Sequence, residues 1–298
     1  MARKRDVVIA VIIIFTFVIA IGFFGLMFLG AYYADDGVDL GGFREKIAVV
    51  EVYGGIYESA SIIRQLKKWG ESNSIRAIIL HIDSPGGAVA PSQEIYEEIL
   101  RVRNEDSKPV IVAMSSVAAS GGYLIACAAD KIMANPGTMT GSIGVIIQFP
   151  TIGKLLDKIG VSYETVKSGE LKDVGAFNKA MTENERKMLT SMITDTYEQF
   201  VDVVSEGRGI EREEVYKIAD GSIFSGRQAL ALKLVDTLGG FEDAVRLAAD
   251  MAGIEGKPRL VREVKPKPGF FDILGSLAGN VREYAAGEVG GPRVMYLY

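Results

Sequence analysis

Short apolar segments alternate with helix-patterned segments along most of the chain after residue 46, and this alternation restricts the folds that the chain can adopt. Strands are expected at 47–52, 76–83, 110–114, 131–134, 143–148 and 162–167. Helices are expected at 59–69, 91–103, 123–129, 151–159, 225–232 and 241–251, and a capping-box pattern from Thr182 to Glu185 opens a further long helix. Strands that alternate with helices pair mostly in parallel, so the pattern predicts an α/β domain.

The N-terminal part of the chain carries an uncharged run, residues 7–33, that follows the basic residues Arg3, Lys4 and Arg5. As a helix at ~1.5 Å per residue, this run is longer than the ~30 Å hydrocarbon core of a bilayer. It is too long for the apolar part of an ordinary signal peptide, and residues 31–33 make a poor cleavage site. Acidic residues follow the run, so the positive-inside rule predicts an uncleaved anchor with a cytoplasmic N-terminus and an exported remainder.

The expected organisation has four parts: a cytoplasmic tip with a transmembrane signal anchor (1–36), a linker (37–45), a folded domain (46–264) and a C-terminal tail (265–298).

The formal net charge of the 298-residue chain is −5, which argues against nucleic acid as a partner. One cysteine and one histidine are present, so the chain can form no internal disulfide and no His- or Cys-based metal cluster. The cysteine, Cys127, lies among alanines and Ile125 and is expected to be a small buried apolar side chain.

A serine lies at a predicted strand-to-helix turn. Small residues follow the strand at 110–114, then come Ser120, Gly121 and Gly122, and then the apolar helix at 123–129. A hydroxyl at such a turn lies near a helix N-terminus, where free N–H groups and the helix dipole favour negative charge. Adjacent glycines allow a substrate backbone to approach closely. On this segment alone, a helix N-cap with a glycine turn is the simpler interpretation.

The segment Ser84-Pro85-Gly86-Gly87 ends one predicted strand and precedes a predicted helix. Its backbone N–H groups could form an anion-binding nest. In an acyl-transfer enzyme this nest would supply half of an oxyanion hole, with the N–H of Gly121 as the other half. Taken alone, the Pro-Gly-Gly sequence predicts only a turn.

A serine nucleophile needs a general base, and the chain offers two kinds. His81 lies inside an apolar strand, which makes it a weak candidate for a Ser-His-Asp triad. The alternative is a lysine, because burial lowers the pKa of an amine and favours its neutral form. Most lysines lie in charged helical segments, whereas Lys172 lies in a glycine-marked loop, 167–175, after a predicted strand. On the sequence pattern alone, Lys172 is also explained as a surface residue.

From 47 to 249, the chain resembles the signal peptide peptidase A family, which are membrane-anchored serine proteases with a Ser-Lys dyad. The resemblance rests on several motifs in order: Asp83-Ser-Pro-Gly-Gly87, Ala119-Ser-Gly-Gly-Tyr123, Thr140-Gly-Ser-Ile-Gly-Val145, Ser168-Gly-x-x-Lys172-Asp173, Ser225-Gly-Arg-Gln-Ala229 and Leu234-Val-Asp-Thr-Leu-Gly-Gly240. Each motif is weak by itself, but their common order makes the resemblance specific. It implies the fold of the Clp protease subunit and the crotonases, which is built from repeated ββα units.

The resemblance also implies roles for individual residues. Ser120 would be the nucleophile and Lys172 the general base, and the Ser142 hydroxyl would orient the lysine amine. Gly87 and Gly121 would supply the oxyanion N–H groups. The spacing between Ser120 and Lys172 matches the short form of the family, which has one catalytic domain per chain. For this form the resemblance implies a homo-oligomeric ring in which neighbouring chains share active sites.

These inferences predict a membrane-anchored Ser-Lys endopeptidase, with residues 46–264 as its peptidase domain. It would need no cofactor and would cut leftover signal peptides and other apolar peptides at the extracytoplasmic face of the cell membrane. Three alternatives remain: a membrane protease that cleaves stomatin-like proteins, a crotonase-like acyl-CoA enzyme, and an inactive scaffold that holds membrane peptides. The sequence offers no role for the tail at 265–298.

Overall fold

The computed structural model describes residues 15–24, 45–263 and 295–296. The chain divides into two units, residues 1–44 and 45–298. In the first unit, residues 15–24 are helical and their side chains are exposed. Among the described residues, no helix has both the length and the apolar character that crossing a membrane requires. Most of the run at 7–33, which the sequence predicts as an anchor, lies outside the described residues.

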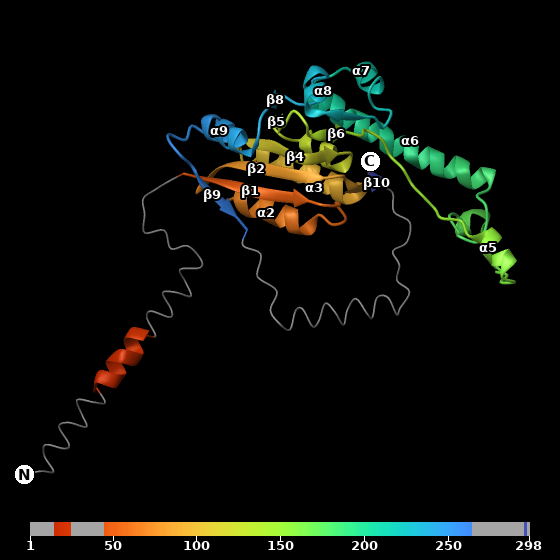
Figure 1. Ribbon diagram of the computed structural model, residues 1–298, viewed down its shortest axis with the longest axis horizontal. Helices are drawn as coiled ribbons and strands as arrows, with labels where there is room; N and C mark the ends of the chain where they lie inside the picture. The colour runs from red at the N-terminus through yellow and green to blue at the C-terminus, as the bar shows by residue number, and fades with distance from the viewer. Residues whose placement is uncertain (1–14, 25–44, 264–294, 297–298) are drawn as a thin grey trace, which may run out of the picture. The chain divides into compact units, whose positions relative to one another are not determined.

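An eight-stranded sheet forms the centre of the second unit (Figure 1). Its main path is β7-β6-β4-β2-β1-β9, and β5 joins β4 while β8 joins β5. The described pairs within this sheet are parallel except β6 with β7, which confirms the predicted α/β class with a largely parallel sheet. The strands are β1 (Lys46–Tyr53), β2 (Ile75–Ser84), β3 (Gly87–Ala88), β4 (Val110–Ala119), β5 (Lys131–Ala134), β6 (Met139–Gly141), β7 (Ile223–Ser225), β8 (Thr237–Leu238), β9 (Arg259–Arg262) and β10 (Met295–Tyr296).

Helices cover both faces of the sheet, because alternate side chains of each strand point to opposite faces. On β2, Ile78 and Leu80 belong to the core beneath α2, α3 and α4, whereas Ala77 and Ile79 pack on α9. The helices are α2 (Ala60–Gly70), α3 (Val89–Asn104), α4 (Gly121–Ala126), α5 (Gly153–Lys158), α6 (Glu183–Arg208), α7 (Arg212–Tyr216), α8 (Gly226–Ala231) and α9 (Phe241–Met251), with a 3₁₀ helix, η1 (Glu170–Asp173).

Two predicted strands are wrong. The segment 143–148 contains only an isolated bridge residue, because the strand in this region, β6, lies earlier and pairs with the end of β4. This pairing also extends β4 from Met114, where the prediction ended it, to Ala119. The segment 162–167 is exposed and forms no strand, and the side chain of Val166 is fully exposed at 101%. Its apolar residues pack against no sheet within the described part of the chain.

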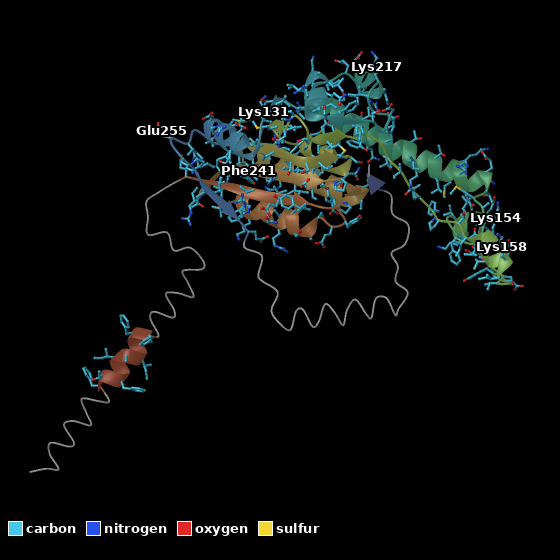
Figure 2. The ribbon with its side chains drawn as sticks, in the orientation of Figure 1. Lys131, Lys154, Lys158, Lys217, Phe241 and Glu255 are labelled. Carbon is cyan, nitrogen blue, oxygen red and sulfur yellow. The ribbon has the colours of Figure 1, made fainter. Side chains whose placement is uncertain are left out.

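The chain between β6 and α7 forms an extension that we call the arm, residues 150–195, made of α5, η1 and the first half of α6. The predicted capping box is present at Thr182, and α6 at ~1.5 Å per residue is about 39 Å long. Only its second half packs on the core, through Phe200 and its neighbours. Met188 and Met192 of the first half are exposed, so the apolar stripe on α6 extends beyond the core. No residue of α5 is buried, and Lys154 and Lys158 lie on it, far from the sheet (Figure 2).

All residues of helix α4 are buried. Tyr123 on this helix is fully buried, and its hydroxyl donates a hydrogen bond of 2.9 Å to the carbonyl oxygen of Leu234. This bond ties α4 to the segment before β8. Burial raises the pKa of the Tyr123 hydroxyl, which therefore stays protonated as a donor.

Replacing Tyr123 with Phe removes this hydroxyl without changing the shape of the ring. We expect the free energy of unfolding to fall by about 1–2 kcal/mol, because the Leu234 carbonyl loses its buried donor. Urea denaturation followed by circular dichroism measures the change. Tyr57→Phe is the control, since Tyr57 is exposed and its change is expected to stay within about 0.5 kcal/mol. Equal stability of the two variants would contradict a structural role for the Tyr123 hydroxyl.

Candidate active site

Ser120 joins the end of β4 to the start of α4 with an unusual backbone, φ 53° and ψ −118°. A non-glycine residue in such a conformation costs on the order of 1–3 kcal/mol. Hydrogen bonds hold it there: its N–H donates to the Gly141 carbonyl at 2.8 Å, and its own carbonyl accepts from the Leu124 N–H at 2.8 Å. The conformation fixes the hydroxyl at the turn between strand and helix.

The Ser120 side chain is completely buried, and its Oγ has no hydrogen-bond partner among the described residues. It does not cap α4, because no side-chain cap bond is present at this helix. Ser120 is thus the N-cap residue of α4 by position only, since its hydroxyl makes no capping bond. A buried hydroxyl without a partner, held by strained backbone, is the arrangement expected of a nucleophile that awaits a base and a substrate.

The two predicted oxyanion glycines lie next to each other. A Cβ added to Gly121 would be 3.2 Å from the Gly87 nitrogen and 2.7 Å from Ser92 Oγ. A Cβ added to Gly87 would be 2.1 Å from the Ile56 carbonyl oxygen, so only glycine fits there. The Pro-Gly-Gly segment is thus more than a surface turn: it packs directly against the residue that follows Ser120. The Gly87 nitrogen and the backbone of Gly121 therefore lie close together.

Ser142 also lies at this site. It follows β6, whose Gly141 pairs with Ala119 in the sheet. Ser142 is nearly fully buried, takes a positive φ of 50°, and donates its N–H to the Ser222 carbonyl at 2.8 Å. The carbonyl of Gly141 accepts the N–H of Ser120. Ser120 and Ser142 therefore follow the ends of two paired strands, β4 and β6.

Lys172 is not part of this cluster. It lies in η1 within the arm, and its side chain is exposed. A hydrogen bond of 2.8 Å from Asn184 Nδ2 to Glu170 Oε1 ties η1 to the first turn of α6. That turn is the end of α6 that lies away from the core. Since Ser120 Oγ has no partner, the Lys172 amine and the Ser120 hydroxyl make no contact within one described chain.

The lysines on either side of Lys172 have other partners. Lys167 and Lys179 contact Asp173 at 2.7 Å and 3.0 Å, and Lys179 also pairs with Glu185. Hydrogen bonds from Lys167 and then Lys179 lower the pKa of Asp173 to about 2, so the carboxylate stays charged and holds this pair across most of the pH range. Lys172 makes no ion pair within the described part of the chain. Lys172 is therefore the one lysine of these three whose amine is not engaged by a carboxylate of the described residues.

His81 is on the other face of the sheet. It follows Ala77 and Ile79 on the face of β2 that packs on α9, and its ring is 4.8 Å from the ring of Phe241. Its Nδ1 is 2.7 Å from the hydroxyl of Tyr53, and burial lowers its pKa. Since α4 and Ser120 belong to the opposite face, His81 is no base for Ser120 within this chain.

Cys127 is buried, as the sequence predicts. Burial raises the pKa of its thiol to about 12, so the reactive thiolate is suppressed and this residue is no nucleophile.

The structure adds one feature that the sequence pattern missed. The C-terminal strand β10 pairs with β3, next to the candidate oxyanion glycine. Two residues are too short a run to stand out as a strand signal.

Comparison with known proteins bears on this site. The model of peptidase family S49 matches residues 102–255, which include Ser120, Ser142 and Lys172, and the Clp protease model matches residues 45–147. A Synechocystis protein named as a protease, slr0021, is 42% identical over 228 residues, which cover 76% of this chain and 81% of that protein.

Two further relatives match shorter parts of longer proteins. A protein of Enterococcus faecium named as a signal peptide peptidase, SppA, is 40% identical over 63% of this chain and 55% of its own length. Protease 4 of Haemophilus influenzae is 38% identical over 69% of this chain and 35% of its own length. These matches favour a peptidase over the crotonase-like alternative. The chain belongs to peptidase family S49 and is a serine peptidase.

Proposed function

We propose that this chain is a membrane-anchored endopeptidase in which Ser120 and Lys172 form the catalytic dyad. Its substrates are cleaved signal peptides and other apolar peptides at the extracytoplasmic membrane face. The observation that carries the proposal is the Ser120 hydroxyl, which is buried, unpartnered and strained, beside the backbone of Gly87 and Gly121.

In this mechanism the Ser120 Oγ attacks the carbonyl carbon of the peptide bond while the Lys172 amine accepts the hydroxyl proton. The N–H groups of Gly87 and Gly121 donate to the oxygen that becomes negative in the tetrahedral intermediate. Lys172 then returns the proton to the leaving amine, and water hydrolyses the acyl-enzyme by the same steps. Ser142 orients the amine as a positioning residue.

The dyad is completed between neighbouring subunits. Two observations support this: Lys172 lies in an arm that leaves the core, and the Ser120 hydroxyl has no hydrogen-bond partner among the residues that the structure describes. The arm also exposes apolar side chains that a second copy would cover: Ile152, Leu155, Ile159, Phe177, Met188 and Met192. An arm of one subunit that reaches the next makes a head-to-tail contact, and such contacts close into rings.

The membrane location and the substrate class rest on sequence features. The run at 7–33 is long enough and apolar enough to anchor the chain. Signal peptides are apolar in their middle, so an enzyme held at the membrane surface encounters them there. A relative in Enterococcus faecium carries the name signal peptide peptidase, which agrees with this substrate class.

Removing either member of the dyad tests the chemistry. Ser120→Ala and Lys172→Ala are each expected to lose nearly all peptidase activity while the circular dichroism spectrum stays unchanged, because nucleophile and base act as a unit. Lys172→Arg is also expected to be inactive, since a guanidinium group does not release its proton. Turnover of a fluorogenic apolar peptide gives the rates.

The matched control is Lys217→Ala, because Lys217 is an exposed lysine directly after α7 that pairs only with Glu214 among the described residues (Figure 2). It is expected to retain full activity. Substantial turnover by Lys172→Ala would assign the base to another residue.

Mixing two inactive variants tests the shared site. Ser120→Ala and Lys172→Ala chains are unfolded and refolded together in equal amounts. If each site takes its serine and its lysine from different subunits, random assembly restores roughly a quarter of the sites. If each subunit holds its own dyad, every site lacks one member and the mixture stays inactive. Mass measurement of the mixed oligomers is the control, and no recovery in confirmed mixtures rejects the shared site.

Protease protection tests the location. A protease added outside intact cells is expected to digest the domain that follows Asp35, because the positive-inside rule exports it. Immunoblotting against the domain reads the result, and a cytoplasmic protein serves as the control for cell integrity. Protection of the domain until the cells are lysed would contradict the proposed topology.

A further inference from the structure

The turn that carries Lys172 is braced by one carboxylate, that of Asp173. Its Oδ1 contacts the Lys167 amine at 2.7 Å and the Lys179 amine at 3.0 Å. Lys167 precedes η1 in the chain, and Lys179 follows it. Asp173 therefore ties the segment before Lys172 to the segment after it.

The Lys167 amine also binds the backbone of this turn. It donates to the carbonyl oxygen of Glu170 at 2.8 Å, in addition to its contact with Asp173. The N–H of Lys172 donates to the Gly169 carbonyl at 3.2 Å. These contacts hold the backbone on both sides of Lys172, whose own side chain is exposed. The turn thus fixes the point from which the Lys172 amine extends.

Lys179 connects the turn to the start of α6. Its amine contacts the carboxylate of Glu185, whose side chain is only 1% exposed. The second oxygen of that carboxylate, Oε2, accepts the N–H of Thr182 at 2.8 Å in the capping box. The hydrogen bond from Asn184 is another link between η1 and α6. The backbone around Lys172 is therefore held by α6, whose second half packs on the core.

Apolar packing does not explain how this turn keeps its shape. No residue of η1 is buried, and no residue of α5 in the same arm is buried. Exposed ion pairs generally add little to stability, because water screens both charges. Hydrogen bonds from Lys167 and then Lys179 lower the pKa of Asp173 to about 2, so its carboxylate is charged at the neutral and alkaline pH at which a lysine base works. The network therefore fixes geometry at a place where it contributes little to folding.

We propose that Asp173 is a positioning residue that holds η1 so that the Lys172 amine extends in one direction, toward the serine of a neighbouring subunit. Lys179 and Glu185 fix Asp173 to α6. This inference rests on the proposed role of Lys172 as the general base. A base displaced by about 1 Å transfers protons slowly, because it must lie within hydrogen-bond reach of the hydroxyl. Peptide binding depends on other residues, so the loss appears in kcat and not in KM.

Asp173→Asn tests this role, because the amide has the size of the carboxylate and lacks its charge. We expect kcat to fall about tenfold or more, with KM within about twofold of the wild-type value. Asp157→Asn is the matched control, since Asp157 is an exposed carboxylate on α5 that makes no ion pair within the described residues. A wild-type kcat in Asp173→Asn would reject the proposal. Loss of the oligomer, seen by native mass spectrometry, would also reject it, because that result assigns a structural role.

Lys179 offers a rescue by a conservative change. Lys179→Met is expected to lower kcat about as much as Asp173→Asn, whereas Lys179→Arg keeps the charged hydrogen bond and is expected to stay within about threefold of wild type. Lys154→Met is the control, since Lys154 is an exposed lysine on α5 in the same arm (Figure 2). An arginine variant as slow as the methionine variant, or an equal loss in Lys154→Met, would contradict positioning by this network.

The chain with both Asp173→Asn and Lys179→Met tests whether the two residues act as one unit. Its kcat is expected to equal that of the slower single variant, because the network is already broken in each. Losses that multiply would show independent effects and would rule out the shared network.

Mixed refolding separates this inference from the catalytic proposal. Asp173→Asn chains refolded with Ser120→Ala chains are expected to exceed the activity of either variant alone, because an intact arm then meets an intact serine. Asp173→Asn chains refolded with Lys172→Ala chains are expected to gain nothing, since both changes affect the arm. A gain in both mixtures would reject the placement of Asp173 with Lys172.

The remaining outcomes assign failure to one proposal or the other. A gain in neither mixture would reject the shared site, while the positioning role is retained through the reduced kcat of Asp173→Asn. Full activity of Lys172→Ala would reject the catalytic proposal and this inference with it. A wild-type kcat in Asp173→Asn, with Lys172→Ala inactive, would reject this inference alone.

Discussion

The contact between two glycine-containing turns is the constraint on which the candidate site depends. The turn before β3 and the turn before α4 come from different strands, and they approach so closely that a Cβ on Gly121 would lie 3.2 Å from the Gly87 nitrogen and 3.3 Å from the Gly86 Cα. Gly122 extends the contact, since its Cβ would lie 2.9 Å from the Ser84 carbonyl. Backbone thus takes the place of side chains where the two turns meet. The parallel pairing of β2 with β4 brings the two turns to the same edge of the sheet.

The sequence predicted the central domain well because its elements are defined by local patterns. The apolar strand at β2 and the helix at α9 are clear examples, and both supply buried residues to the core. The errors lie in the arm, where the segment 162–167 has apolar residues that cover no core of this chain. A periodic pattern reports that a face is apolar, but it does not report what covers that face. The first half of α6 illustrates the same limit.

The candidate site shows which kinds of information a sequence lacks. The Pro-Gly-Gly segment alone indicated a turn, because its contact with Gly121 depends on a residue far along the chain. Ser120 was identified as a candidate from local context, but its positive φ and unpartnered hydroxyl depend on β6 and on burial. Lys172 was selected by resemblance to a family, and the fold of a single chain leaves it exposed in the arm, out of contact with the Ser120 hydroxyl. The two-residue strand β10 gives no pattern at all.

The positive φ angles of Ser120 and Ser142 have a consequence for how stability and activity are related in this enzyme. Each costs on the order of 1–3 kcal/mol, and both lie at the ends of adjacent strands in a densely buried region. A glycine at position 120 would relax that conformation while it abolishes the chemistry. An inactive chain of this family can therefore be harder to unfold than its working ancestor. Selection for stability alone would favour replacement of Ser120 by a residue without this strain. The serine is therefore retained only while peptide cleavage is itself under selection.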